Sequence, residues 1–161
     1  MNVRTNITEA MADFHDLARA AEAAVRSSVR AALKEAVDSF FRNSPVYTAN
    51  YRSNLSLLLG GKRTGAYVAK RWRKAGAYSS VAAARRRTIL AAVKQWQPGQ
   101  EVEFENLADH AGILEYGGPS IAARAPMRLL GDTLVAELEK TDFGAGLERE
   151  WNPRSTGARP R

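Results

Sequence analysis

The sequence predicts an α+β protein with a long N-terminal helix, a small, mostly antiparallel sheet with two further helices, and an extended C-terminal tail. Three observations support this. Apolar residues recur at steps of three and four over residues 7–42, which is the spacing of one helix face. Residues 101–105 alternate carboxylate and apolar side chains, the period of a strand that is covered on one side. Turns containing glycine or proline separate the other periodic segments, and such short connections suit antiparallel neighbours.

The first part of the chain, residues 1–42, is predicted to be a long amphipathic helix. Its apolar stripe includes Met11 and Phe14, and alanine and valine fill its middle. Pro45 ends the helix, because proline disfavours the helical conformation in the residue before it. At 1.5 Å per residue the helix is about 50 Å long, which exceeds what a small domain can cover. We therefore expect part of the stripe to pack on a neighbouring copy.

A core domain is predicted over residues 43–141, and it begins with a strand and a loop. Residues 54–59 are rich in leucine and end at a glycine pair, which is the pattern of a strand followed by a turn. Residues 62–78 show no clean period and predict a long, basic loop. Two serines then precede a helix that we expect over residues 81–96.

The second half of the core domain opens with the clearest strand, over residues 101–105. Residues 111–116 continue as a strand or a short helix, and the apolar spacing predicts a helix over residues 127–141. The last segment, residues 142–161, holds three glycines, two prolines and four arginines. This composition predicts a flexible basic tail.

The length of 161 residues suits one domain, and the composition excludes several kinds of site. The chain has no cysteine, which excludes disulfide scaffolds, thiol catalysis and cysteine-ligated zinc. His15 and His110 lie far apart, so we expect no histidine-rich metal site and no cofactor. No apolar run reaches the roughly 18 residues of a membrane span, and the start lacks the apolar stretch of a signal peptide. We expect a soluble protein in a reducing compartment.

Charge is distributed unevenly along the chain, which has a formal net charge of +7. Residues 62–87 hold nine basic residues and no acidic one, whereas residues 88–141 hold four basic and eight acidic residues. Such a dipolar arrangement suits head-to-tail contact between subunits, docking onto an acidic protein, or contact with nucleic acid. Val, Ile, Leu and Phe make up only about a fifth of the chain. Because these residues can form only a small core, we expect burial against a partner to add stability.

The expected contact residues are basic or aromatic. Trp72 can stack on a nucleic-acid base while its basic neighbours hold phosphates, or it can anchor a protein interface, where tryptophan and arginine are common. The residues predicted for partner or oligomer contact are Lys70, Arg71, Trp72, Arg73, Arg85, Arg86, Arg87 and Trp151. A face that would line a channel and repel DNA passing through it is predicted at Glu101, Glu103 and Glu105.

Enzymatic interpretations have weaker support in the sequence. The glycine pair before Lys62 departs from a phosphate-binding loop, because Arg63 stands where serine or threonine is needed and Ser56 where glycine is needed. A small hydrolase centred on His110 and Glu115 is a further alternative. A lone histidine in a turn is more often an ordinary surface residue than a general base.

Two segments resemble the neck and tail-completion proteins of tailed bacteriophages. The first begins at Ser44 and reads Ser-Pro-Val-Tyr-Thr-Ala-Asn-Tyr-Arg-Ser-Asn-Leu, which is similar to the family's Ser-Pro-Val-Asp-Thr-Gly pattern followed by an arginine and a strand. The second runs from Phe104 through Leu-Glu-Tyr-Gly-Gly to Ala-Pro-Met-Arg at Ala125, and it is similar to the family's ending. The resemblance covers residues 44–141, and the long leading helix agrees with it in kind.

The chain departs from the family pattern at three places. Tyr47 stands where the family usually has aspartate, and Ala49 where it has glycine. His110 and its two neighbours replace a tyrosine–alanine step. Loss of a backbone-bonding aspartate and of a glycine conformation leads us to expect altered turns at these places.

The resemblance implies a structural protein of the virion, located in the neck between head and tail and assembled in the host cytoplasm. It implies a homo-oligomeric ring of six or twelve copies that contacts a head-side connector or stopper protein, the tail terminator, or the tail tube protein. DNA would pass through the lumen without specific binding, and neither enzymatic activity, a cofactor nor membrane contact is implied. The main alternative is a DNA-binding module that uses residues 62–87, whose affinity would fall steeply with salt.

Overall fold

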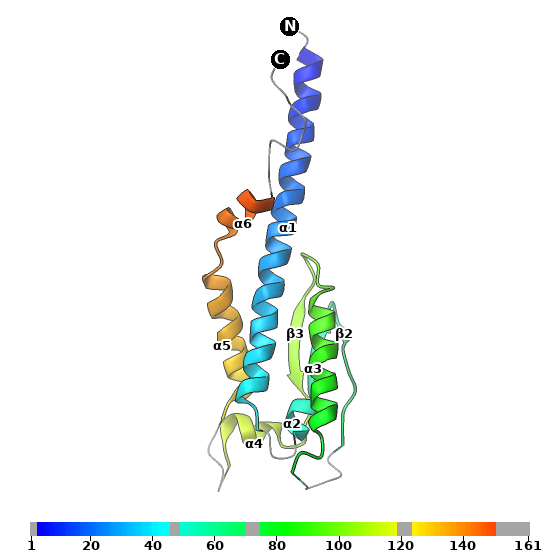
Figure 1. The fold of residues 1–161 in the computed structure, drawn as a ribbon, viewed down its shortest axis with the longest axis vertical. Coiled ribbons are helices and arrows are strands. Elements are labelled where there is room, and N and C mark those ends of the chain that lie inside the picture. The colour runs from blue at the N-terminus through cyan, green and yellow to red at the C-terminus, as the bar shows by residue number, and fades with distance from the viewer. Residues whose placement is uncertain (1–2, 46–48, 70–74, 119–123, 151–161) are drawn as a thin grey trace.

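The computed structural model describes residues 3–45, 49–69, 75–118 and 124–150, and it confirms the α+β class (Figure 1). Over these residues the elements in chain order are α1 (Val3–Asn43), α2 (Asn50–Ser53), β1 (Leu55–Leu59), β2 (Lys62–Arg63), α3 (Ser79–Val93), β3 (Val102–Asn106), α4 (Ala111–Tyr116), α5 (Pro126–Glu139) and α6 (Phe143–Glu150).

Helix α1 is the axis of the molecule. It runs along most of the length, with α5 along one side and with α3 and the sheet along the other (Figure 1). Its N-terminal turns extend past α6 and past every other described element. The helix ends where both the backbone N–H and the hydroxyl of Ser44 donate to the carbonyl oxygen of Phe40, at 2.9 and 2.6 Å. The prediction of one over-long N-terminal helix is thus confirmed.

The sheet is antiparallel, with the strand order β2-β1-β3. A two-residue turn at Gly60 and Gly61 joins β1 to β2, and both φ angles are positive, at 54° and 76°. Hairpin turns of this length favour such angles, which glycine adopts without strain. In the register between β1 and β3, Leu57 lies opposite Phe104. Because side chains alternate between the faces, Leu57 and Leu59 share the core face with Phe104 and Val102, whereas Leu58 shares the other face with Glu103.

The core lies where α1 meets β1 and α3. Leu33, Val37 and Phe40 recur at helical spacing on one face of α1 and are fully buried together with Leu57 of β1 and Ile89 of α3. One face of α1 therefore carries the core in the C-terminal half of the helix.

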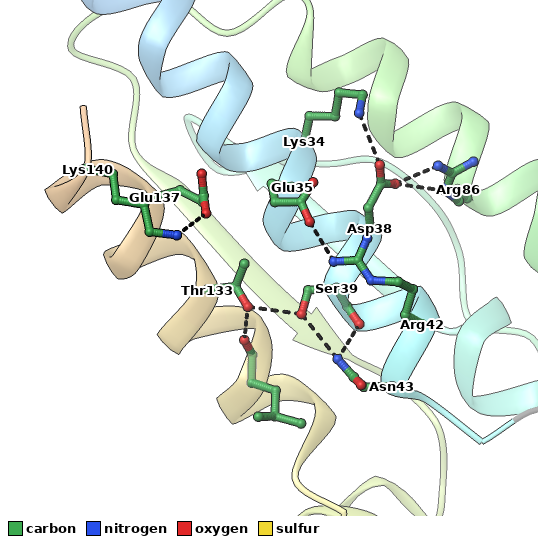
Figure 2. Close-up of polar contacts among 11 residues, drawn as sticks. Lys34, Glu35, Asp38, Ser39, Arg42, Asn43, Arg86, Thr133, Glu137 and Lys140 are labelled. Atoms are coloured by element: carbon green, nitrogen blue, oxygen red, sulfur yellow. Dashed lines mark hydrogen bonds and ion pairs between the residues drawn. The ribbon is translucent and has the colours of Figure 1, made fainter. Parts of the chain in front are cut away.

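Polar contacts tie α1 to the helices on both sides of it (Figure 2). Asp38 of α1 accepts two hydrogen bonds from Arg86 of α3, at 3.0 and 2.6 Å, and one from Lys34 at 3.2 Å. Burial opposes ionisation of Asp38, but these cations outweigh it and hold the pKa of the carboxyl below its ordinary value. On the other side, the hydroxyls of Ser39 and of Thr133 in α5 lie 2.9 Å apart.

The short elements differ from the sequence prediction. Residues 50–53 form α2, which the sequence does not predict, and β2 forms at the start of the segment that is predicted to be a loop. Residues 111–116, for which the sequence predicts either a strand or a short helix, form helix α4. One turn of helix carries no detectable periodicity, and its stability comes from the contacts around it.

The predicted extended tail is wrong for its first part, because residues 143–150 form helix α6 against α1 (Figure 1). A carboxylate oxygen of Asp142 accepts the backbone N–H of Ala145 at 2.9 Å, which satisfies a donor at the start of the helix. Gly146 is buried, and a Cβ placed there would lie 3.4 Å from the Cβ of Ala24 on α1. Small residues on both helices thus allow close packing. Residues 151–161 lie outside the described part of the chain.

Candidate interaction surface

The two segments that carry the family resemblance meet at one end of the molecule. The hydroxyl of Tyr51, from the first segment, donates to the carboxylate of Glu115, from the second. The Asn106 side-chain amide donates to the Tyr51 carbonyl oxygen at 3.0 Å, and the backbone N–H of Leu107 donates to the Asn54 carbonyl oxygen at 3.1 Å. Residues of the two segments therefore form one connected scaffold.

Glu115 acts as a structural link in this scaffold. The oxygen that accepts from Tyr51 also accepts the backbone N–H of Met127 at 2.8 Å, in the first turn of α5. Burial and the bond to Glu115 both raise the pKa of the Tyr51 hydroxyl above its ordinary value. The ring of His110 lies 6.0 Å from the ring of Tyr51, centroid to centroid. These contacts give Glu115 the role of a helix cap and give no support to its use as a catalytic base with His110.

Ala49 adopts a backbone conformation that favours glycine. Its φ and ψ are 59° and 11°, in the left-handed region, immediately before α2. The expected alteration of this turn is therefore wrong at Ala49, while Tyr47 lies outside the described residues. An alanine in this region is strained by roughly 1–2 kcal/mol, because its Cβ approaches the following carbonyl oxygen.

We expect Ala49→Gly to raise the free energy of unfolding by about 0.5–1 kcal/mol, since relief of strain exceeds the added entropy of the unfolded chain. Urea unfolding followed by circular dichroism measures it. The matched control is Ala84→Gly, at an exposed helical position of α3, which should lower stability by about 1 kcal/mol. A loss of stability in both variants would contradict the strain at Ala49.

The structure describes only the three arginines of α3 among the predicted contact residues. Lys70, Arg71, Trp72, Arg73 and Trp151 lie outside the described residues. Arg85 is only 8% exposed, and its guanidinium donates to the carbonyl oxygens of Leu55 at 3.0 Å and Ala66 at 2.5 Å. Arg85 is thus engaged within the subunit, where its hydrogen bonds hold the loop after β2 against β1, and its predicted partner contact gains no support.

The other two arginines of α3 remain at the surface. Arg86 is engaged by Asp38, as described above, and Arg87 is exposed. Burial lowers the pKa of the Arg85 guanidinium, but arginine remains protonated in proteins. Three consecutive arginines therefore have three surroundings: the interior, a surface ion pair, and open surface.

The predicted acidic face of β3 is present in part. Glu101 and Glu103 are exposed, whereas Glu105 is half-buried and paired with Arg63 of β2. A basic residue from the 62–87 segment thus meets the acidic strand within one chain. Glu101 and Glu103 remain as the exposed part of the face that we predicted to line a channel.

An apolar stripe stands exposed on the N-terminal turns of α1, and we call it the N-terminal stripe. It consists of Ile7, Met11 and Phe14, whose residues are 56%, 58% and 75% exposed. Their spacing of four and three places them on one helix face. The length of this helix predicts that part of its stripe is uncovered, and the structure locates that part on the turns beyond α6.

A groove lies between α1 and α3, and we call it the α1/α3 groove. Its volume is about 510 Å³, and no acidic residue lines it. The apolar part is contributed mainly by Leu90 and the alanines beside it, and four cations surround it. The lining residues are Arg30, Ala31, Lys34, Arg87, Leu90, Ala91, Val93 and Lys94. Of these residues, only Arg87 belongs to the predicted contact set. The sequence could not predict the groove, because its two walls are far apart along the chain.

Other kinds of site find no support in the described residues. Among them no group of three or more histidine, aspartate or glutamate side chains could hold a metal ion. None of the helices in the same part of the chain combines the length and the apolar character needed to cross a membrane. No protein-family model matches the chain, and comparison with curated proteins and with solved structures found no match either.

Proposed function

We propose that this protein is a structural subunit of the head–tail junction of a tailed bacteriophage, a neck or tail-completion protein that assembles as a ring. One observation carries the proposal: the N-terminal stripe extends past the rest of the described fold. Three large apolar residues on one exposed helix face are typical of an interface that is completed by another chain. The motif resemblance supplies the kind of assembly, and the segregated charge suits contacts between unlike surfaces of neighbouring subunits.

The ring would lie in the virion neck, between the head-side connector or stopper protein and the tail terminator or tail tube. Glu101 and Glu103 are exposed and are proposed to face the lumen. Carboxylates there would repel the phosphates of DNA that passes through, which allows passage without binding. No catalytic step is part of the proposal.

Native mass spectrometry over a concentration series tests the assembly, and electron microscopy of intact particles tests its location. We expect a closed species of six or twelve copies, and density for this chain between head and tail. A protein that stays monomeric at high concentration and does not bind purified heads or tails would overturn the proposal.

DNA binding through residues 62–87 is the second candidate, and the structure makes it weaker. Of the five described cations in this segment, Arg63 and Arg86 pair with carboxylates and Arg85 is buried. Fluorescence anisotropy with labelled duplex DNA distinguishes the candidates. Several phosphate contacts would make affinity fall by orders of magnitude between roughly 50 and 200 mM salt, whereas the junction protein should bind weakly at both.

A further inference from the structure

We infer that the N-terminal stripe of one subunit occupies the α1/α3 groove of a second copy of this chain. The inference rests on the proposed function and specifies its subunit contact. It joins the exposed apolar face of the N-terminal stripe to the open, positively charged α1/α3 groove.

The groove offers an apolar floor between two helices and an excess of positive charge. Arg30 is held at the rim by the Trp96 carbonyl oxygen, to which it donates two hydrogen bonds of 3.1 and 2.8 Å. Lys34 contacts Asp38 at 3.2 Å. Arg87 and Lys94 pair with no carboxylate among the described residues. The groove therefore suits a helix that is apolar on one face and acidic overall.

The N-terminal turns of α1 have these two properties. Residues 5–19 contain three acidic residues and one basic residue, Arg19, and the same stretch carries the N-terminal stripe. Side chains of the stripe can enter the groove, while Asp13 and Asp16 lie on other faces of the helix. Asp16 already pairs with Arg19 of the same helix, so Asp13 and the net negative charge of these turns supply the attraction. It acts over a Debye length of about 8–10 Å in physiological salt, without direct pairing.

The occupant must come from another chain, because one wall of the groove is α1 itself. Phe14 and Arg30 lie on the same continuous helix, about 24 Å apart along its axis at 1.5 Å per residue. The stripe cannot fold back onto the groove without breaking that helix. A contact between two different surfaces repeats from copy to copy and closes into a ring where the rotation allows.

Cysteine cross-linking tests the contact directly, since the natural chain has no cysteine. The double variant Phe14→Cys with Ala91→Cys places one thiol in the stripe and one in the groove. Mild oxidation should give a ladder of covalent oligomers on denaturing gels. The matched control, Ala12→Cys with Ala84→Cys, uses exposed positions outside the stripe and the groove and should give little ladder.

A blocking variant gives a second measurement that does not depend on oxidation. Ala91 is exposed in the groove, so Ala91→Glu should leave the subunit folded and raise the concentration for half-assembly by about tenfold or more. Ala84→Glu on the same helix is the control and should leave assembly unchanged. Circular dichroism of both variants checks that they fold.

The outcomes separate the inference from the proposed function. Wild-type oligomers without a Phe14–Ala91 ladder, and unaffected by Ala91→Glu, overturn the inference and leave the ring standing. The same result shows that the groove serves another partner or none. A specific ladder from a chain that is absent from particle necks supports the contact and overturns the proposed location. A chain that stays monomeric under all conditions overturns both.

Discussion

Phe40→Ala is expected to lower the free energy of unfolding by about 3–5 kcal/mol, the range for removing a fully buried phenylalanine from a close-packed core. Phe40 is fully buried. Its ring stacks on that of Tyr51 with a centroid separation of 5.5 Å, and it meets the ring of Phe41 edge-on at 5.6 Å. Alanine would leave a cavity where α1 meets α2, with the two neighbouring rings unsupported.

Urea unfolding followed by circular dichroism measures this loss as a lower midpoint at an unchanged slope. Phe14→Ala is the matched control on the same helix. Phe14 is exposed and far from the core, so at concentrations below assembly its loss should change stability by no more than about 0.5 kcal/mol. Equal losses in the two variants would contradict the position of the core along α1.

Arg85→Ala is expected to cost about 2–3 kcal/mol, because it removes two hydrogen bonds from a charged, buried donor. The Leu55 and Ala66 carbonyl oxygens would lose these bonds. The loop after β2 packs directly on the guanidinium, since a Cβ placed on Gly65 would lie 2.4 Å from its Nη1 atom. We therefore expect the loop to open as stability falls.

Two measurements check this expectation. Urea unfolding gives the stability, and limited proteolysis under native conditions reports opening of residues 64–69. Arg87→Ala, two positions further along α3, is the control, because Arg87 is exposed and pairs with no carboxylate among the described residues. It should change stability by less than about 0.5 kcal/mol. If Arg87→Ala costs as much as Arg85→Ala, the assignment of Arg85 to the interior is wrong.

Long, strongly periodic segments were predictable from the sequence. The helices around residues 7–42, 81–96 and 127–141, and the strands at 54–59 and 101–105, agree with α1, α3, α5, β1 and β3 within a few residues at their ends. In each of them the residues that decide the structure lie within one or two turns of each other, or at alternate positions of one strand. Periodicity along the chain records such local relations directly.

The short elements were not predictable, because they depend on contacts that periodicity along the chain does not record. Helix α6 forms because Asp142 satisfies its first turn and because Gly146 can approach Ala24. Gly146 and Ala24 are more than 100 positions apart, and glycine taken alone disfavours a helix. The left-handed Ala49 is a similar case, since only the surrounding turn holds it in a conformation that alanine avoids.

Composition and spacing along the chain are enough to identify the over-long apolar stripe, the lean core and the separation of basic from acidic segments, because they are properties of the chain. Packing in three dimensions is needed to show which arginine of α3 is buried and where the α1/α3 groove lies. Consecutive residues of a helix point about 100° apart, so Arg85, Arg86 and Arg87 cannot be told apart until α3 packs against β1. Arg30 of α1 and Arg87 of α3 both line the groove. They come together only when two helices that are distant in the sequence lie side by side, and no local sequence pattern predicts this.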